Sequence, residues 1–258
     1  MKKYLNIAEA YDLINNKLKE NGVNNEEIIP WIICKVLRIL KKDYKLIKRV
    51  RKDKVELMIN VVKRYINGET LSEIFKYIEF YGKLFSVSEN VFDPRLSSES
   101  LIDAFKKEKS SVNSILDLCT GSGCLGIILS IIYKKSEVDA VDISINALKI
   151  AELNNKKLKG NVLFREMDIL QDWNKVLTKK YDVIVSNPPY FSIKKIIEKK
   201  DLTKNNPLNA FYGGEDGMKF HKRIIKNAPF FLNKRGMLFL EMEEEQEDII
   251  KKLLEKIL

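Results

Sequence analysis

The chain has 258 residues, of which 45% are hydrophobic and 32% are charged, and its formal net charge is +10. This is enough for one large domain or two small ones with a buried core. Because no unbroken run of 18 apolar residues occurs, we expect no transmembrane helix and no membrane association. Glu9 and Asp12 interrupt the apolar residues near the start, which excludes a secretory signal and favours a cytoplasmic protein.

The amino-terminal part shows helical spacing of apolar residues and little strand signal. We expect helices over about 5–18, 28–40 and 55–66, the last one ending at an Asn-Gly-Glu stop. Thr70 followed three residues later by Glu73 is a capping-box pattern that starts a further short helix. The sequence therefore predicts a helical first domain over residues 1–76.

The stretch at 77–95 contains "EFYGKLFSVSENVF", which predicts short strands around a Gly-Lys turn, a β-hairpin linker between two domains. Charge is uneven along the chain. Residues 35–54 carry 10 Lys or Arg against 2 Asp, and an acidic run follows at 241–248. The basic stretch is consistent with a nucleic-acid footprint, with a face for an acidic partner, or with a solvated helix face.

From residue 113 onward, short apolar runs alternate with helical segments. This β-α alternation predicts a mostly parallel, doubly wound sheet with buried strands, an α/β domain over residues 96–258. In such sheets, ligands bind beyond the carboxyl ends of the strands. The expected strands are "SILDL", "EVDAVD", "NVLFREMD", "YDVIVS" and "GMLFLEM", with helices from about Cys124, Ser144 and Asp216 and a last helix near the end.

The first of these strands runs into the glycine-rich stretch "LDLCTGSGCLG". Gly121, Gly123 and Gly126 form a G-x-G-x-x-G pattern that opens a helix, and Asp142 ends the next strand, 21 residues after Gly121. Glycines let the backbone approach a ligand closely, and the acidic residue can accept hydrogen bonds from ribose hydroxyls. On this pattern alone, NAD is a fair interpretation.

Two details favour S-adenosylmethionine instead. Asp117 lies four residues before Gly121. A carboxylate there repels a pyrophosphate but suits a cationic amine. The loop is also entered through Cys119 and Thr120 rather than directly from an apolar strand. Because S-adenosylmethionine has an amino group, a ribose and no phosphate, the sequence predicts this cofactor, with S-adenosylhomocysteine as product.

The third strand of this part ends in "EMD". Asp168 is in place to bind the exocyclic amine of an adenine, with Ile169 packing on the ring. The alternative is an aspartate that only caps a loop or a helix.

The fourth strand ends in "NPPY", an amide followed by two prolines and an aromatic ring. The Asn187 side-chain oxygen and the Pro188 carbonyl can accept from both N–H groups of a planar nitrogen and face its lone pair toward a methyl donor. Tyr190 offers a flat face near the sulfonium. This predicts methyl transfer by in-line displacement, driven by positioning and without a strong base. The alternative is a structural turn.

Cysteines and histidine complete the candidate chemistry. Cys34, Cys119 and Cys124 show no CxxC spacing, so we expect reduced thiols and no zinc or other metal. His221 cannot belong to a histidine-rich metal site because it is the only histidine, and we expect it on the surface of a helix.

Taken together, these stretches resemble the release factor glutamine methyltransferases of the PrmC or HemK type, over nearly the whole chain. The combination of NPPY with "GGEDGM" and the helix-then-hairpin front end is the specific part, because NPPY alone is shared with adenine methyltransferases. The matching stretches are "EFYGKLFSV", "VFDPRLSSES", "LDLCTGSGC", "AVDIS", "IVSNPPY" and "AFYGGEDGMKFHKRI".

The resemblance implies a class I, Rossmann-like methyltransferase that methylates the glutamine side chain in the Gly-Gly-Gln tip of peptide chain release factors and modulates translation termination. It implies a release factor as protein partner, and we expect a monomer without stable nucleic-acid binding. Implied cofactor contacts are Cys119, Thr120, Gly121, Ser122, Gly123, Asp142, Asp168 or Ile169, and Asn187. Implied glutamine contacts are Asn187, Pro188, Pro189 and Tyr190.

Some positions depart from the family pattern. "PRLSSE" replaces the usual "PRPETE" while keeping Pro94, Arg95 and Glu99, and Asn206 replaces a glutamate. The family fold closes with an antiparallel hairpin, whereas Leu258 follows soon after the last predicted helix. We therefore expect the closing antiparallel strands to be missing, which would leave a sheet edge unpaired.

Two other function classes remain open on the sequence. The first is methylation of adenine amino groups in nucleic acid, which the basic stretch favours and "GGEDGM" disfavours. The second is a binding module with a degenerate site, which the intact "TGSG" and "NPPY" disfavour.

Overall fold

A computed structural model describes residues 3–88, 91–199 and 207–255 of the chain. The chain divides into two compact units, Met1–Lys83 and Leu84–Leu258, so the division lies inside the 77–95 segment. Each unit is described by itself. Asn206, where the sequence departs from the family pattern, lies outside the described residues.

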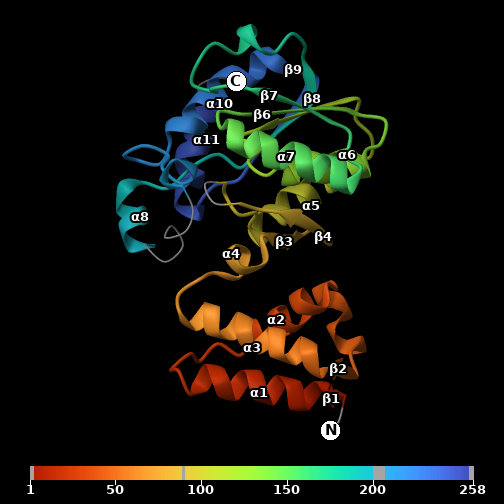
Figure 1. Ribbon diagram of the computed structural model, residues 1–258. Coiled ribbons are helices and arrows are strands. Elements are labelled where there is room, and N and C mark those ends of the chain that lie inside the picture. The colour runs from red at the N-terminus through yellow and green to blue at the C-terminus, as the bar shows by residue number, and fades with distance from the viewer. Residues whose placement is uncertain (1–2, 89–90, 200–206, 256–258) are drawn as a thin grey trace. The chain divides into compact units, whose positions relative to one another are not determined.

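The amino-terminal unit is helical, as predicted. Apolar residues at helical spacing from three helices build one core, and the fourth helix starts at the predicted capping box of Thr70 and Glu73. Two three-residue strands, β1 (Tyr4–Asn6) and β2 (Arg49–Arg51), pair antiparallel and were not predicted. Three residues are too few to show a strand alternation. The helices are α1 (Ile7–Lys19), α2 (Ile28–Leu37), α3 (Lys52–Ile66) and α4 (Leu71–Phe75) (Figure 1).

The basic stretch does not form one helix face. It runs through the end of α2, the 3-10 helix η1 (Lys41–Leu46), β2 and the start of α3. Lys35 is only 7% exposed, and its Nζ donates to the Tyr77 carbonyl at 2.7 Å. Lys41 Nζ lies 4.4 Å from the centroid of the Trp31 ring. Part of the basic stretch therefore holds this unit together, and most of the remainder is exposed.

Two short strands follow, β3 (Tyr77–Phe80) and β4 (Lys83–Ser86). Tyr81 and Gly82 connect them, and both have positive φ, which is the conformation that a tight hairpin turn requires. The predicted short strands around the glycine are thus present.

The carboxyl-terminal unit has, within the described residues, a five-stranded sheet in the order β7-β6-β5-β8-β9, with every neighbouring pair parallel. The predicted α/β sheet is confirmed, and the described residues add no antiparallel strand to it. The strands are β5 (Ser114–Leu118), β6 (Glu137–Asp142), β7 (Val162–Glu166), β8 (Tyr181–Ser186) and β9 (Leu232–Leu240).

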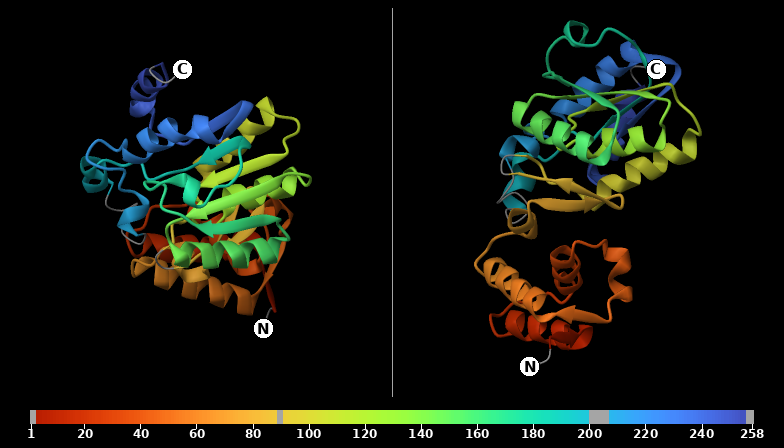
Figure 2. Two further views of the ribbon diagram at one scale, coloured as in Figure 1. Left: turned by 90° about the horizontal axis from the view of Figure 1, so that it is seen from above. Right: turned by 45° about the vertical axis from the view of Figure 1, so that its right-hand side comes forward.

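Helices cover both faces of this sheet (Figures 1 and 2). α6 and α7 pack together against β5, β6 and β7, and α10 packs on the opposite face. The short helix α8 follows β8 along the chain, after the NPPY segment. The bounds are α5 (Glu99–Glu108), α6 (Cys124–Ile132), α7 (Ile145–Leu158), α8 (Ile193–Glu198), α10 (Lys219–Phe231) and α11 (Glu247–Glu255).

The strand order reverses between β5 and β8, since β6 and β7 lie on one side of β5 while β8 and β9 lie on the other. Leu118 is level with Ser186 in the register of these two strands. The glycine-rich stretch after β5 and the NPPY stretch after β8 therefore leave the sheet side by side, at the edge where such folds bind ligands.

Candidate active site

A cavity of about 250 Å³ lies at this edge of the sheet. Its wall includes most of the residues that the sequence predicted to contact a cofactor. These are Cys119, Thr120, Gly121, Ser122, Asp142, Asp168, Ile169 and Asn187, together with Pro189.

Asp117 supports the glycine-rich stretch from behind. Its carboxylate is fully buried, and Oδ2 accepts from the Thr120 hydroxyl at 2.6 Å and from the Gly126 N–H at 2.9 Å. A Cβ at Gly126 would lie 3.1 Å from that oxygen, which explains the glycine. Burial raises the pKa of Asp117 to about 7. Asp117 therefore shapes the loop through these two hydrogen bonds, and its contact with the cofactor amine stays a prediction.

The glycines at 121 and 123 have positive φ, and Gly123 is the N-cap of α6, with no place on the cavity wall. A Cβ at Gly123 would lie 3.0 Å from Ala151 Cβ, whereas one at Gly121 would meet nothing within 4 Å. Gly123 is therefore required for helix packing, and Gly121 leaves open space on the cavity side.

Asp142 ends β6 at the cavity. Its Oδ2 accepts from the Gly121 N–H at 2.8 Å, and its Oδ1 accepts from the Ser144 N–H at 2.9 Å. Burial raises the pKa of this carboxyl above its usual value. Each carboxylate oxygen can accept more than one bond, so both can also accept from a ligand hydroxyl. The following Ile143 is 58% exposed and lines the cavity, which makes it an apolar platform that the sequence analysis missed.

Asp168 and Ile169 follow β7 on the same wall. Asp168 Oδ1 accepts from the Leu170 N–H at 2.9 Å, and the Ile169 carbonyl accepts from Trp173 Nε1 at 2.7 Å. Ile169 is buried and its backbone is fixed, so its side chain is a rigid part of the wall. The donor and acceptor set fits a nucleoside with ribose hydroxyls and a flat base between apolar side chains.

A second cavity of about 430 Å³ adjoins the first. Pro188 and Tyr190 lie on its wall, while Pro189 faces the first cavity. The two cavities share four wall residues, which are Phe92, Arg95, Asn187 and Ala210. Asn187 is thus the NPPY residue that lines both cavities.

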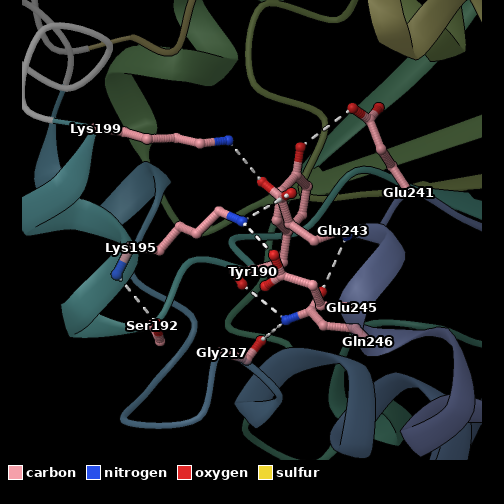
Figure 3. Close-up of polar contacts among 9 residues, drawn as sticks. All are labelled: Tyr190, Ser192, Lys195, Lys199, Gly217, Glu241, Glu243, Glu245 and Gln246. Carbon is pink, nitrogen blue, oxygen red and sulfur yellow. Dashed lines mark hydrogen bonds and ion pairs between the residues drawn. The ribbon is translucent and has the colours of Figure 1, made fainter.

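The segment after Asn187 is held from behind (Figure 3). Gln246 Nε2 donates to the Tyr190 carbonyl at 2.9 Å and to the Gly217 carbonyl at 3.3 Å. The Tyr190 hydroxyl donates to Glu241 Oε1 at 3.3 Å. Burial and the neighbouring glutamates raise the pKa of Tyr190 well above its usual value, so this hydroxyl keeps its proton. Tyr190 is therefore fixed at both its backbone and its ring.

Gly213 and Gly217, from the "GGEDGM" stretch, pack directly on this segment. A Cβ at Gly213 would lie 2.7 Å from the Pro189 carbonyl oxygen, and one at Gly217 would lie 2.4 Å from the Tyr190 carbonyl oxygen. No side chain fits at either position, so these glycines are required by the presentation of NPPY.

Ion pairs fasten α8 at the rim of the second cavity. Lys195 Nζ lies 3.3 Å from Glu243 and 3.2 Å from Glu245, and Lys199 Nζ lies 3.1 Å from Glu243 (Figure 3). The acidic run near the end of the chain is thus partly neutralised by one lysine of α8 and by Lys199, which follows it.

His221 is not on the surface, and its prediction is wrong. The side chain is 0% exposed because α10 turns it toward the sheet, where Nε2 lies 2.9 Å from the Glu241 carbonyl oxygen. Burial lowers its pKa, so the imidazole is kept neutral. The sequence showed no sign of this, since a lone histidine on an amphipathic helix gives no indication of its face.

All three cysteines are free thiols. Among the described residues no cluster of three or more His, Cys, Asp or Glu side chains is arranged to hold a metal ion. In the same part of the chain, no helix is both long and apolar enough to cross a membrane.

Comparisons with known proteins agree with this geometry. Residues 84–205 match the family model described as methyltransferase small domain. The chain is 32% identical to a release factor glutamine methyltransferase of Thermodesulfovibrio yellowstonii, over 95% of this chain and 89% of the relative. It is 29% identical to the Bacillus cereus protein of the same name, over 98% of this chain and 91% of that one.

Longer relatives and solved structures match as well. A bifunctional methyltransferase of Rickettsia bellii is 31% identical over 92% of this chain, which spans only 48% of that protein. Among solved structures, a methyltransferase from Pyrococcus furiosus superposes with a TM-score of 0.53 at 18% identity, over 77% of this chain and 87% of that one. At this identity, the structural match supports the fold alone.

Proposed function

The chain belongs to the release factor glutamine methyltransferase family, and on that premise we propose that it methylates the side-chain amide nitrogen of a glutamine in peptide chain release factors. It is an S-adenosylmethionine-dependent methyltransferase of the Rossmann-like fold. The target we propose is the glutamine of the Gly-Gly-Gln motif. The release factor is the protein partner, and the enzyme acts as a monomer in the cytoplasm.

The observation that carries this proposal is the place of Asn187 on the wall of both cavities. The first cavity has the acidic strand ends and apolar platform that suit the cofactor. When bound there, S-adenosylmethionine supplies an electrophilic methyl group on a sulfonium. Asp142 is in place to accept from ribose hydroxyls, Asp168 from the adenine amine, and Ile143 and Ile169 to pack on the base.

The second cavity then receives the glutamine side chain. The Asn187 oxygen and the Pro188 carbonyl accept from its two N–H groups, and the nitrogen lone pair is directed toward the first cavity. A new nitrogen–carbon bond forms as the carbon–sulfur bond breaks, and the nitrogen afterwards gives one proton to water. The chain's own contribution is positioning and pre-organised acceptors, because a planar amide is a weak nucleophile.

Labelled cofactor tests the proposal directly. The enzyme is given an intact release factor, the same factor with its Gly-Gly-Gln glutamine replaced, and RNA or DNA. The proposal requires label in the intact factor only, as a methylated glutamine identified by mass analysis. Label on adenine would instead assign a nucleic-acid methyltransferase, and binding of cofactor without any transfer would assign a binding module.

Asn187→Ala is the matching test of the chemistry. We expect turnover to fall about 10²–10³-fold, the loss typical of one positioned polar group at a reacting centre. Cofactor affinity should change much less, because Asp142 and the glycine-rich stretch remain. Full activity of this variant would refute the mechanism even if the substrate were right.

A further inference from the structure

We propose that Ser98 and Glu241 are positioning residues that fix which end of the Asn187 side-chain amide faces the methyl acceptor. The proposal rests on the function proposed above and adds a requirement to it. The two ends of an asparagine amide have nearly the same shape, but one end accepts hydrogen bonds and the other donates them. An Asn187 turned by half a rotation would present N–H groups to the N–H groups of the target and could not orient it.

Two successive hydrogen bonds set the orientation of the Asn187 amide. Asn187 Nδ2 donates to Ser98 Oγ at 2.8 Å, and the Ser98 hydroxyl donates to Glu241 Oε2. A hydroxyl has a single proton, and an ionised carboxylate can only accept. Once that proton is given to Glu241, Ser98 has only lone pairs left for Asn187. The NH₂ end is therefore the only end of the amide that fits against Ser98, and the oxygen is turned away from it.

Glu241 is itself held in place. Its Oε1 accepts from the Ser97 hydroxyl at 3.0 Å and from the Tyr190 hydroxyl at 3.3 Å. His221 Nε2 contacts its backbone carbonyl, so the residue is fixed at both ends. Figure 3 shows the carboxylate at the hydroxyl end of the Tyr190 side chain. The two oxygens thus have separate donors, and Oε2 is left to Ser98.

Burial makes the arrangement selective. Ser98 is only 2% exposed, so water has little access to replace either bond. A buried polar group without a partner is costly, and this is the penalty that a reversed amide would meet at Ser98. Three separate segments meet here, since Ser98 precedes α5, Asn187 follows β8 and Glu241 follows β9.

The test compares variants that differ only in this chain of bonds. In Ser98→Ala the amide loses its acceptor. In Glu241→Gln, the new NH₂ group can donate to Ser98, whose proton is then free to hold the Asn187 oxygen in the wrong orientation. For both, we expect kcat for release factor methylation to fall about ten- to a hundredfold, with the Kd for cofactor changed less than about threefold.

Two controls separate positioning from general damage. Ser98→Thr keeps the hydroxyl and should recover activity to within about threefold of the parent. Ser136→Ala removes another buried hydroxyl, which donates to the Val112 carbonyl and lines neither cavity, and it should stay within about twofold. Parental kcat in folded Ser98→Ala and Glu241→Gln would overturn the proposal, as would a loss confined to KM or equal losses in Ser136→Ala.

A measurement on the parent protein covers variants that do not fold. In protein labelled with ¹⁵N at asparagine, the Asn187 NH₂ protons should show nuclear Overhauser contacts to the Ser98 Cβ protons. Their absence, with NH₂ protons that instead contact protons across the cavity, would overturn the proposed orientation. This result does not depend on the substrate. An inactive parent that shows these contacts would therefore count against the proposed function and not against the orientation of Asn187.

Discussion

Adding one methyl group at Gly217 tests how the NPPY segment is held. Gly217 has φ of +73°, and a Cβ there would lie 2.4 Å from the Tyr190 carbonyl oxygen and 2.8 Å from Gln246 Nε2. Both contacts are too short for real atoms, and the first is to backbone. Gly217→Ala must therefore push the Tyr190 carbonyl away and break the Gln246 bond to it.

The size of the effect follows from these contacts. A non-glycine residue in the left-handed region costs about 1–2 kcal/mol. Leaving the Tyr190 carbonyl without its partner adds about 1–3 kcal/mol. We therefore expect Gly217→Ala to lower the free energy of unfolding by about 2–5 kcal/mol. Turnover should fall about a hundredfold, because a displacement of about 1 Å near the reacting centre has that effect.

Gly214→Ala is the matched control. It lies in the same loop and has φ of +96°, but its Cβ would meet the Lys219 side chain, with Cβ nearest at 3.0 Å, and no atom of the NPPY segment. We expect about 1–2 kcal/mol of destabilisation and turnover within about twofold of the parent. The assays are denaturant titration and methylation of release factor well below the unfolding midpoint. Equal losses of turnover in the two variants, or full activity of Gly217→Ala, would refute the reasoning.

Three further predictions follow from the described contacts. Asp142→Ala removes charge-assisted hydrogen bonds worth about 1.5–3 kcal/mol. Calorimetry should therefore show S-adenosylmethionine binding weakened about ten- to a hundredfold. Unchanged affinity of the variant, or tight NAD binding by the parent, would contradict this assignment. Replacing the exposed Lys45, Lys48 and Arg49 with Gln should have a modest effect on the methylation rate and should flatten its salt dependence. Complete loss of methylation in a folded variant would show that this surface is essential. Burial lowers the pKa of His221, so as the pH falls below about 6.5 the unfolded chain binds a proton before the folded chain does. The free energy of unfolding should therefore drop by up to about 1.4 kcal/mol per pH unit. In denaturant titrations, His221→Gln should flatten this slope.

The sheet could be predicted from the sequence because buried parallel strands have a clear signature. The predicted "EVDAVD" and "YDVIVS" coincide with β6 and β8 at both ends. Each is a short stretch with β-branched apolar residues that ends in a polar residue, so the local sequence was enough to indicate a strand. β9 begins at Leu232, four residues before the predicted Gly236, because the strand continues through polar residues that carry no strand signal. α8 went unpredicted, since six residues show no helical period.

Only some of the candidate site residues could be predicted from the sequence, for a physical reason. Residues that end a strand or directly follow one, such as Asp142 and Asn187, could be placed because the carboxyl ends of parallel strands meet at one edge. Asp117 is the second-to-last residue of β5, where successive side chains point to opposite faces of the sheet. The sequence could not show whether its side chain faces the cofactor or supports the glycine-rich stretch. The apolar Ile143 was overlooked because an isoleucine after an acidic strand end looks like ordinary core.

The orientation of the Asn187 side-chain amide cannot be predicted from the NPPY stretch alone. The NPPY sequence fixes where an amide, a carbonyl and a ring are presented, but it contains nothing that distinguishes the two ends of that amide. The groups that do so are Ser98, which lies 89 residues before Asn187, and Glu241, which follows the next strand, β9. They can act only once β8 and β9 have paired, since Glu241 donates its backbone N–H to the Ser186 carbonyl at 3.0 Å, immediately before Asn187. Formation of the β8–β9 pair thus brings the carboxylate to the amide that it orients, and the acceptor site is completed by folding of the sheet itself.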